Sequence, residues 1–250
     1  MSSEVPIRKK GGGRSWFAFV LGLIVLAILL ALGTWQVQRL AWKEGLLATI
    51  EQRMHAPPLG LRDAEQLFAQ TGDVDYVPLS VQGTFLHEGE RHFLATWNGQ
   101  SGFYVYTPLK LEDGRFLLVN RGFVPYDKKD AASRAQGQIE GNVTITGLAR
   151  NPLGEKPSSL IPDNDLAKNV FYWKDRDVMA ATAGLPAGYV LVPFFLDADE
   201  TPNPGGWPVG DVTIIALPNN HLGYAVTWYG LAAALVGVMV FARVGRRRPQ

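Results

Sequence analysis

Histidine is the residue type best able to do metal or acid–base chemistry in this 250-residue chain, which contains four histidines and no cysteine. Without cysteine the chain has no disulfides, thiolate zinc sites, iron–sulfur clusters or cysteine nucleophiles. His87 and His92 lie around a predicted turn, and nothing nearby supplies the further ligands of a closed metal site. His55 stands just before Pro57-Pro58, where it is most simply a polar residue at a helix end. We therefore favour solvated polar residues over a metal pair at His87 and His92, and over a weak copper site at Met54 and His55.

His221 differs from the others because it stands at the start of a long apolar segment. A titratable side chain at a membrane edge is costly unless it has a partner, which makes it a candidate functional residue. On a helix it shares a face with Tyr224, Ala225, Trp228 and Ala232. A neutral imidazole there could ligate a haem iron, with the macrocycle against the helix. The alternatives are a histidine anchored among lipid headgroups, or one hydrogen-bonded to a neighbouring helix.

Two cations could complete such a site. Arg39 and Lys43 follow the first apolar segment, and we expect them near the level of His221. They could pair with anionic haem propionates, although cationic side chains at a helix end also snorkel to the membrane surface without any ligand.

A second polar group interrupts an apolar strand at Asn120, Arg121 and Gly122. Arg121 could bind a carboxylate of a partner, or it could simply shape a bulge together with Gly122. The sequence contains no GxSxG motif, no HExxH motif and no phosphate-binding loop ending in Lys-Ser or Lys-Thr. Hydrolase and transferase chemistry therefore find little support.

Two segments are long and apolar enough to cross a membrane. Residues 16–35 and 222–242 contain no charged side chain, and each would cover about 30 Å as a helix. The first is longer than the apolar core of a cleaved signal peptide, which is about 7–15 residues. We therefore predict two transmembrane helices, 16–35 and 222–242.

Charge predicts the orientation of these helices. The chain has 24 basic and 23 acidic side chains, a balance that does not suggest a nucleic-acid partner. Basic residues gather in the tails 1–15 and 243–250. Because such residues stay on the cytoplasmic side, both tails should be cytoplasmic and residues 36–221 should lie on the other side.

The segment between the two spans is rich in predicted strands. Alternating apolar residues bounded by turn residues predict strands at 77–85, 90–97, 102–111, 114–125, 142–150, 169–175 and 188–197. The first helix should continue to Pro57, and shorter helices are expected at 62–70 and 175–185. Residues 126–140 are predicted to be a loop and 198–211 an extended approach to the second span. The fold class is therefore α+β: two transmembrane helices flanking an antiparallel, β-rich, barrel-like extramembrane domain.

Three separated motifs resemble one known family. They are LGTWQVQRLAWKEGLL at 32–47, LLVNRGFVP at 117–125, and GGWPVG at 205–210 leading into LPNNHLGYAVTWYGLA at 217–232. VPLSVQGTF and GFYVYTPLKLEDG precede the second motif in the order that the family shows. Together these stretches resemble the surfeit locus protein 1 family of cytochrome c oxidase assembly factors. One departure is Phe123, where members often carry tryptophan.

The resemblance implies a protein that is not an enzyme but an assembly factor for haem–copper (aa3-type cytochrome c) oxidase. It implies that haem a is bound transiently, that its iron is ligated by the residue at His221, and that the protein assists haem insertion into the large haem-bearing oxidase subunit. Tyr224, Trp228, Arg39 and Lys43 would surround the haem. The implied partners are this subunit, the haem a synthesis machinery and membrane lipid.

The alternative function is a colourless membrane-anchored scaffold that stabilises an oxidase assembly intermediate. It would hold an oxidase subunit through Asn120, Arg121 and Gly122 or through residues 205–210. The short N-terminus, which contains Glu4, is unlike an organellar transit peptide. We therefore expect the bacterial cell inner membrane, with residues 36–221 in the periplasm, in preference to the mitochondrial inner membrane.

Overall fold

The computed structural model describes residues 12–213 and 219–245, with side chains at 16–213 and 219–244. The chain divides into two compact units. We call residues 12–49 with 219–245 the helical unit, and residues 50–213 the sheet unit. Apart from Arg243, the basic residues of the two predicted tails lie outside the described side chains.

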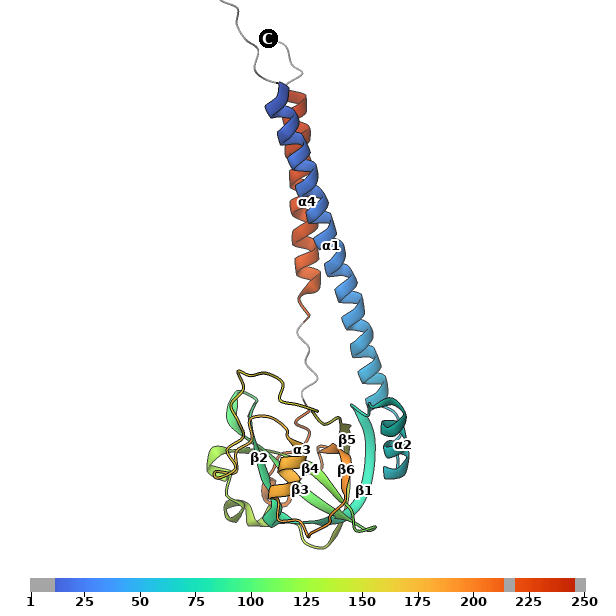
Figure 1. The fold of residues 1–250 in the computed structure, drawn as a ribbon, viewed down its shortest axis with the longest axis vertical. Coiled ribbons are helices and arrows are strands. Elements are labelled where there is room, and N and C mark those ends of the chain that lie inside the picture. Colours follow the sequence, from blue (N-terminus) through green and yellow to red (C-terminus); the bar gives the residue numbers. More distant parts are fainter. Residues whose placement is uncertain (1–11, 214–218, 246–250) are drawn as a thin grey trace, which may run out of the picture. The chain divides into compact units, whose positions relative to one another are not determined.

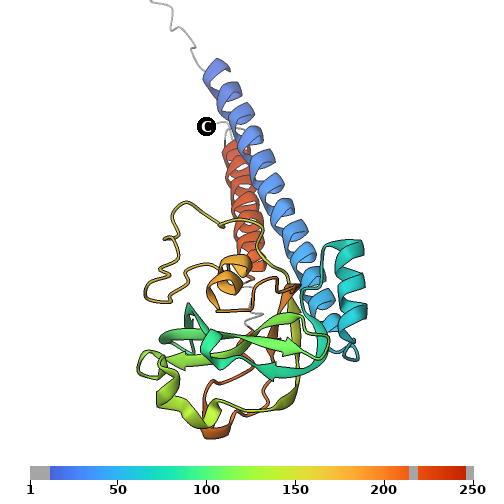
Figure 2. The ribbon, with the colours of Figure 1, turned by 60° about the horizontal axis from the view of Figure 1, so that its bottom comes forward.

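The helical unit consists of α1, Gly12–Met54, whose last turn enters the sheet unit, and α4, His221–Gly245. Both helices are long and apolar enough to cross a membrane. Each contains one of the predicted spans, and α1 continues past the first span almost to Pro57, as expected. Figures 1 and 2 show the two helices side by side.

Small residues let α1 and α4 approach closely. A Cβ atom added at Gly33 of α1 would lie 2.9 Å from Cε1 of Tyr229, and one added at Gly22 would lie 3.0 Å from Sδ of Met239. The hydroxyl groups of Thr34 and Tyr229 lie 3.1 Å apart across the same contact. Because lipid is as apolar as the helices, close packing and polar contacts of this kind must hold the pair together.

The described part of the sheet unit contains one six-stranded sheet. Its strands are β1 Val77–Phe85, β2 Arg91–Trp97, β3 Gln100–Leu111, β4 Phe116–Pro125, β5 Asn142–Arg150 and β6 Leu191–Ala198. Their order is β1-β5-β6-β4-β3-β2, with a further pairing of β1 to β3. That pairing covers three residue pairs and is the feature that supports the barrel-like part of the prediction.

Two predictions for this unit were wrong. The sheet is mixed, not purely antiparallel, because β6 pairs parallel to β4. Residues 169–175 do not form a strand; Phe171 makes one isolated bridge to Phe93 of β2. The side chain of Asn164 accepts hydrogen bonds from the backbone N–H groups of Tyr172 and Trp173, which replaces strand pairing at these positions.

The remaining predicted elements differ mainly at their ends. The helix expected at 62–70 is α2, Leu61–Thr71, and the helix expected at 175–185 is the shorter α3, Arg176–Thr182. The expected loop at 126–140 contains two short 3-10 helices, Tyr126–Lys128 and Ala131–Gly137. The stretch at 198–211 contains another, Pro204–Gly206, and Val209 bridges to Phe123 of β4.

The core lies on both faces of β4, which is buried along its whole length. On one side Leu117 and Val119 pack with β1, β6 and α2. On the other side Leu118 and Phe123 pack with Met179 of α3. This position in the core places Asn120, Arg121 and Gly122 in the interior of the sheet unit.

Candidate functional site

His221 is the first residue of α4, and its imidazole contacts α1. Its Nδ1 atom lies 2.7 Å from Oε1 of Gln36, a buried side chain in α1. An amide oxygen can only accept a hydrogen bond, so Nδ1 carries the proton and donates it to Gln36. A proton on Nδ1 leaves the lone pair on Nε2, where a metal can bind. The expected alternative of a hydrogen bond to a neighbouring helix is therefore confirmed, and it is compatible with ligation through Nε2.

The face of α4 that contains His221 has two parts. Ala225 and Ala232 are buried, and they lie on the stripe that packs against α1. Tyr224 is 56% exposed and Trp228 is half-buried, and both lie on the flank of the helix beside His221. A flat apolar ligand on His221 would therefore lie along the two aromatic rings and not over the alanines.

The two predicted cations lie on the same side of α1 as Gln36, three and seven residues farther along the helix. The guanidinium carbon of Arg39 lies 3.9 Å from the ring centroid of Trp42, and Lys43 is half-buried. Their pairing with propionates of a ligand stays a prediction.

Asn120 and Gly122 form part of the interior of the sheet unit. The Asn120 side chain donates a 3.0 Å hydrogen bond to Oδ1 of Asp197 on β6, and its oxygen accepts one from the Gly122 N–H at 3.1 Å. Gly122 has φ of 119°, and a Cβ atom there would collide with the carbonyl oxygen of Val209. These two residues thus fasten β4 to β6 and to the segment around Val209.

Arg121 points to the other side of β4, into a group of buried and half-buried ionisable residues that we call the Glu90 cluster. It consists of His87, Glu90, His92, Arg121 and Arg134. Arg134 binds both carboxylate oxygens of Glu90, at 3.0 Å to Oε1 and in a shorter contact to Oε2. Arg121 approaches the same carboxylate at 3.6 Å and donates hydrogen bonds to the carbonyl of Gly137 and, at 3.0 Å, to Asn203.

The two histidines of this cluster are neutral near pH 7. Burial lowers the pKa of His92 to about 4, and burial also lowers the pKa of His87. The Nε2 atom of His92 is buried and has no hydrogen-bond partner among the described residues. No group of three or more histidine, aspartate or glutamate side chains placed to hold a metal ion occurs among the residues that the structure describes.

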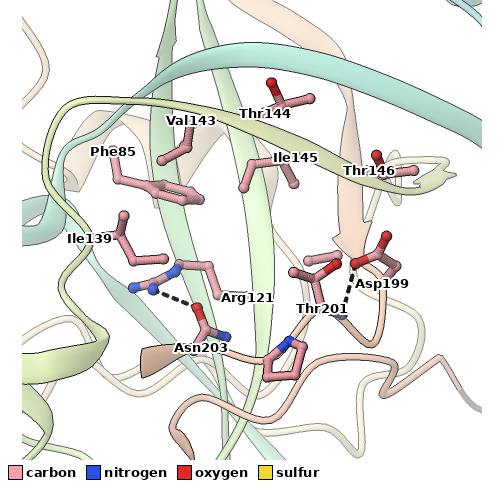
Figure 3. Close-up of a pocket in the computed structure, with 12 residues that line it drawn as sticks. Phe85, Arg121, Ile139, Val143, Thr144, Ile145, Thr146, Asp199, Thr201 and Asn203 are labelled. Carbon is pink, nitrogen blue, oxygen red and sulfur yellow. Dashed lines mark hydrogen bonds between the residues drawn. The ribbon is translucent and has the colours of Figure 1, made fainter. Parts of the chain in front are cut away.

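A cavity of about 250 Å³ opens beside Arg121 (Figure 3). Phe85, Ile139, Val143 and Ile145 form its apolar wall, and the guanidinium of Arg121 lies between Ile139 and Asn203. Asp199 and Thr201 line the opposite end. Because Arg121 is only 2% exposed, any partner that binds it must enter this cavity.

The partners of both candidate sites could not be predicted from the sequence. Gln36 lies within the first motif, one residue after Trp35, but a single glutamine past an apolar segment carries no signal for a buried contact. Glu90 and Arg134 are 44 residues apart, one at the start of a predicted strand and the other in a predicted loop. Their pairing follows from tertiary contacts that residue spacing does not reveal.

The chain is similar to known proteins over most of its length. The model of the SURF1 family matches residues 23–233. A SURF1-like protein of Monosiga brevicollis is 35% identical, with 97% of this chain and 92% of the relative aligned. Surfeit locus protein 1 is 37% identical in Homo sapiens, covering 88% of this chain and 75% of the relative, and 35% identical in Rattus norvegicus, covering 94% and 76%. The chain belongs to the SURF1 family.

Proposed function

We propose that this protein is a membrane-anchored assembly factor for haem–copper (aa3-type cytochrome c) oxidase. It binds haem a through His221 and assists insertion of the haem into the large oxidase subunit. Membership of the SURF1 family, which is linked to cytochrome c oxidase assembly, supports the general role. The two helices that can cross a membrane fit a function at the membrane. In this proposal haem a is a cargo, and the protein acts as a carrier without turnover.

The hydrogen bond between His221 and Gln36 is the observation that carries the haem proposal. It fixes the proton on Nδ1 and holds the imidazole against α1, so that Nε2 can serve as the metal ligand. One exchangeable nitrogen ligand suits a carrier, since the bond must later be given up to the oxidase. Haem a supplies an iron that accepts one axial imidazole nitrogen.

The residues around His221 also suit a haem. Tyr224 and Trp228 offer aromatic surface on the flank of α4, and Arg39 and Lys43 can pair with propionate groups. We place the protein in a bacterial inner membrane with both termini cytoplasmic and residues 36–221 periplasmic. There it would receive haem a from the synthesis machinery and meet the large oxidase subunit within the lipid.

A visible spectrum tests the proposal. Full-length protein is purified in detergent from cells that make haem a, in parallel with His221→Ala at equal expression. A Soret band that is lost or shifted in His221→Ala supports ligation by His221. A colourless parent protein, or identical spectra, would contradict it and favour the scaffold function, in which the sheet unit holds an oxidase subunit.

A further inference from the structure

The Glu90 cluster holds more positive than negative charge. Arg134 occupies both oxygens of the Glu90 carboxylate, which is 4% exposed. The guanidinium of Arg121 therefore lies 3.6 Å from Oε1 of Glu90, an oxygen that Arg134 already binds. Among the described residues, one carboxylate in this cluster serves two buried guanidinium groups.

The other contacts of Arg121 do not offset its charge. It donates hydrogen bonds to the Gly137 carbonyl and the Asn203 amide oxygen, and it lies 3.4 Å from Nδ1 of His87. The carbonyl and the amide oxygen carry no charge, and His87 is neutral near pH 7 because burial lowers its pKa. Burial lowers the pKa of Arg121 to about 10, so the guanidinium still carries its charge at neutral pH. A buried guanidinium that shares its one carboxylate with a second guanidinium is incompletely neutralised, and an anion next to Arg121 would lower that cost.

The cavity beside Arg121 has the shape and lining to admit such an anion. Its wall of Phe85, Val143 and Ile145 is apolar, and the Phe85 ring centroid lies 4.8 Å from the guanidinium carbon (Figure 3). The volume of about 250 Å³ lies just below the range of about 300–1,000 Å³ that is typical of pockets for drug-sized ligands. The cavity therefore fits only a small molecule.

We propose that this cavity is a binding site for a small monocarboxylate with an apolar body. The carboxylate accepts hydrogen bonds from Arg121, and the hydrocarbon part packs against Phe85 and Ile145. Asp199 lines the far end of the cavity, so an acid with a second carboxylate would meet a like charge there. The site lies in the sheet unit and does not depend on the proposed binding of haem to His221.

Binding of pentanoate to the full-length protein in detergent tests this site. Isothermal titration calorimetry compares pentanoate with pentanol, which lacks the charge, and with glutarate, which carries a second carboxylate. We expect pentanoate to bind about tenfold or more tightly than either. Equal affinity for pentanol, or no binding of pentanoate at millimolar concentration, would overturn the proposal.

Two variants localise the binding without touching Arg121. Ile145→Trp fills the cavity from its wall and should weaken pentanoate binding about tenfold or more. Val190→Trp places the same side chain at an exposed position of the sheet unit that does not line the cavity, and it should bind pentanoate like the parent. A folded Ile145→Trp protein with unchanged affinity would refute the site. Arg121→Met, if folded, should abolish the preference for pentanoate over pentanol.

Discussion

Oε1 of Gln36 lies 2.7 Å from Nδ1 of His221, and this contact joins α1 to α4. Apolar packing alone permits several registers of two helices in lipid, because one apolar surface substitutes for another. The contact between Gln36 and His221, with the hydroxyl contact between Thr34 and Tyr229, selects one of them. The same bond therefore sets the register of the pair and the tautomer of the proposed haem ligand.

Replacement of Gln36 should change the electronic properties of a bound haem. With Gln36→Leu the imidazole loses its acceptor and becomes a weaker donor to iron, so the haem reduction potential should rise. With Gln36→Glu the stronger acceptor should lower the potential. Spectroelectrochemical titration of the purified proteins measures both shifts.

Tyr229→Phe is the matched control for these variants. It removes a second polar contact between α1 and α4 without touching His221. We expect its potential to equal that of the parent protein. A shift as large as that of Gln36→Leu would mean that Gln36 acts only through helix packing.

The stability of the sheet unit should fall in weak acid because His92 is buried in its neutral form. Burial lowers the pKa of His92 from 6.5 to about 4, although Glu90 nearby raises it. The unfolded chain takes up a proton near pH 6.5 and the folded one only near pH 4, so stability is complete above 6.5 and falls as the pH drops between these values. The loss attributable to His92 amounts to about 3 kcal/mol at most.

Urea unfolding of the full-length protein in detergent at pH 7 and pH 5 measures this effect. His92→Gln keeps a polar partner for Asn169 and should lose less stability between the two pH values than the parent protein. His55→Gln, which changes an exposed histidine, should behave like the parent. If His92→Gln and the parent lose the same amount, another group causes the acid sensitivity.

Removal of Arg134 should destabilise the sheet unit. Arg134→Met removes the bidentate partner of Glu90 and leaves that carboxylate to Arg121 at 3.6 Å, which we expect to cost about 3–5 kcal/mol. The double variant Arg134→Met with Glu90→Gln also leaves Arg121 buried without a carboxylate and should be less stable still. Chemical denaturation of the parent and the two variants checks this order. A double variant more stable than Arg134→Met would show that the charge of Arg121 does not need Glu90.

Gly122→Ala should destabilise the sheet unit by roughly 3 kcal/mol or more. The φ of 119° excludes ordinary side chains, and the Val209 carbonyl fills the space that a Cβ atom would need. Gly141→Ala is the control, because Gly141 also has a positive φ, 80°, but open space around it. Thermal unfolding should show a clearly larger loss for Gly122→Ala. Equal losses would mean that backbone conformation alone decides the cost.

The sequence predicts those parts of the fold that depend on local pattern. The helices α1 and α4 follow from runs of apolar residues, and the strands β1 to β4 follow from alternation between turn residues. The parallel pairing of β6 with β4 could not be predicted, because it joins segments about 75 residues apart whose hydrophobic patterns fit either direction equally well. Residues 169–175 have the alternation of a strand but do not form one. The side chain of Asn164 accepts hydrogen bonds from the N–H groups of Tyr172 and Trp173, and periodicity carries no signal for this contact.

The candidate sites were predictable to a different degree. His221 stands out because a titratable residue beside an apolar segment is rare. The sequence predicts that Arg121 could bind a carboxylate. Its burial, and the sharing of Glu90 with Arg134, depend on the packing of three separate segments. Nothing in the sequence distinguishes Gln36 from an exposed glutamine, so only the structure identifies it as the partner of His221.

The place of β6 has a consequence for how the protein is made. β6 lies between β5 and β4, yet it is the last strand of the sheet to be synthesised. Until residue 198 has been synthesised, β4 and β5 each have an edge open to other chains. A premature stop codon anywhere before β6 would therefore do more than delete α4. It would leave an incomplete sheet that is prone to aggregation and susceptible to proteolysis.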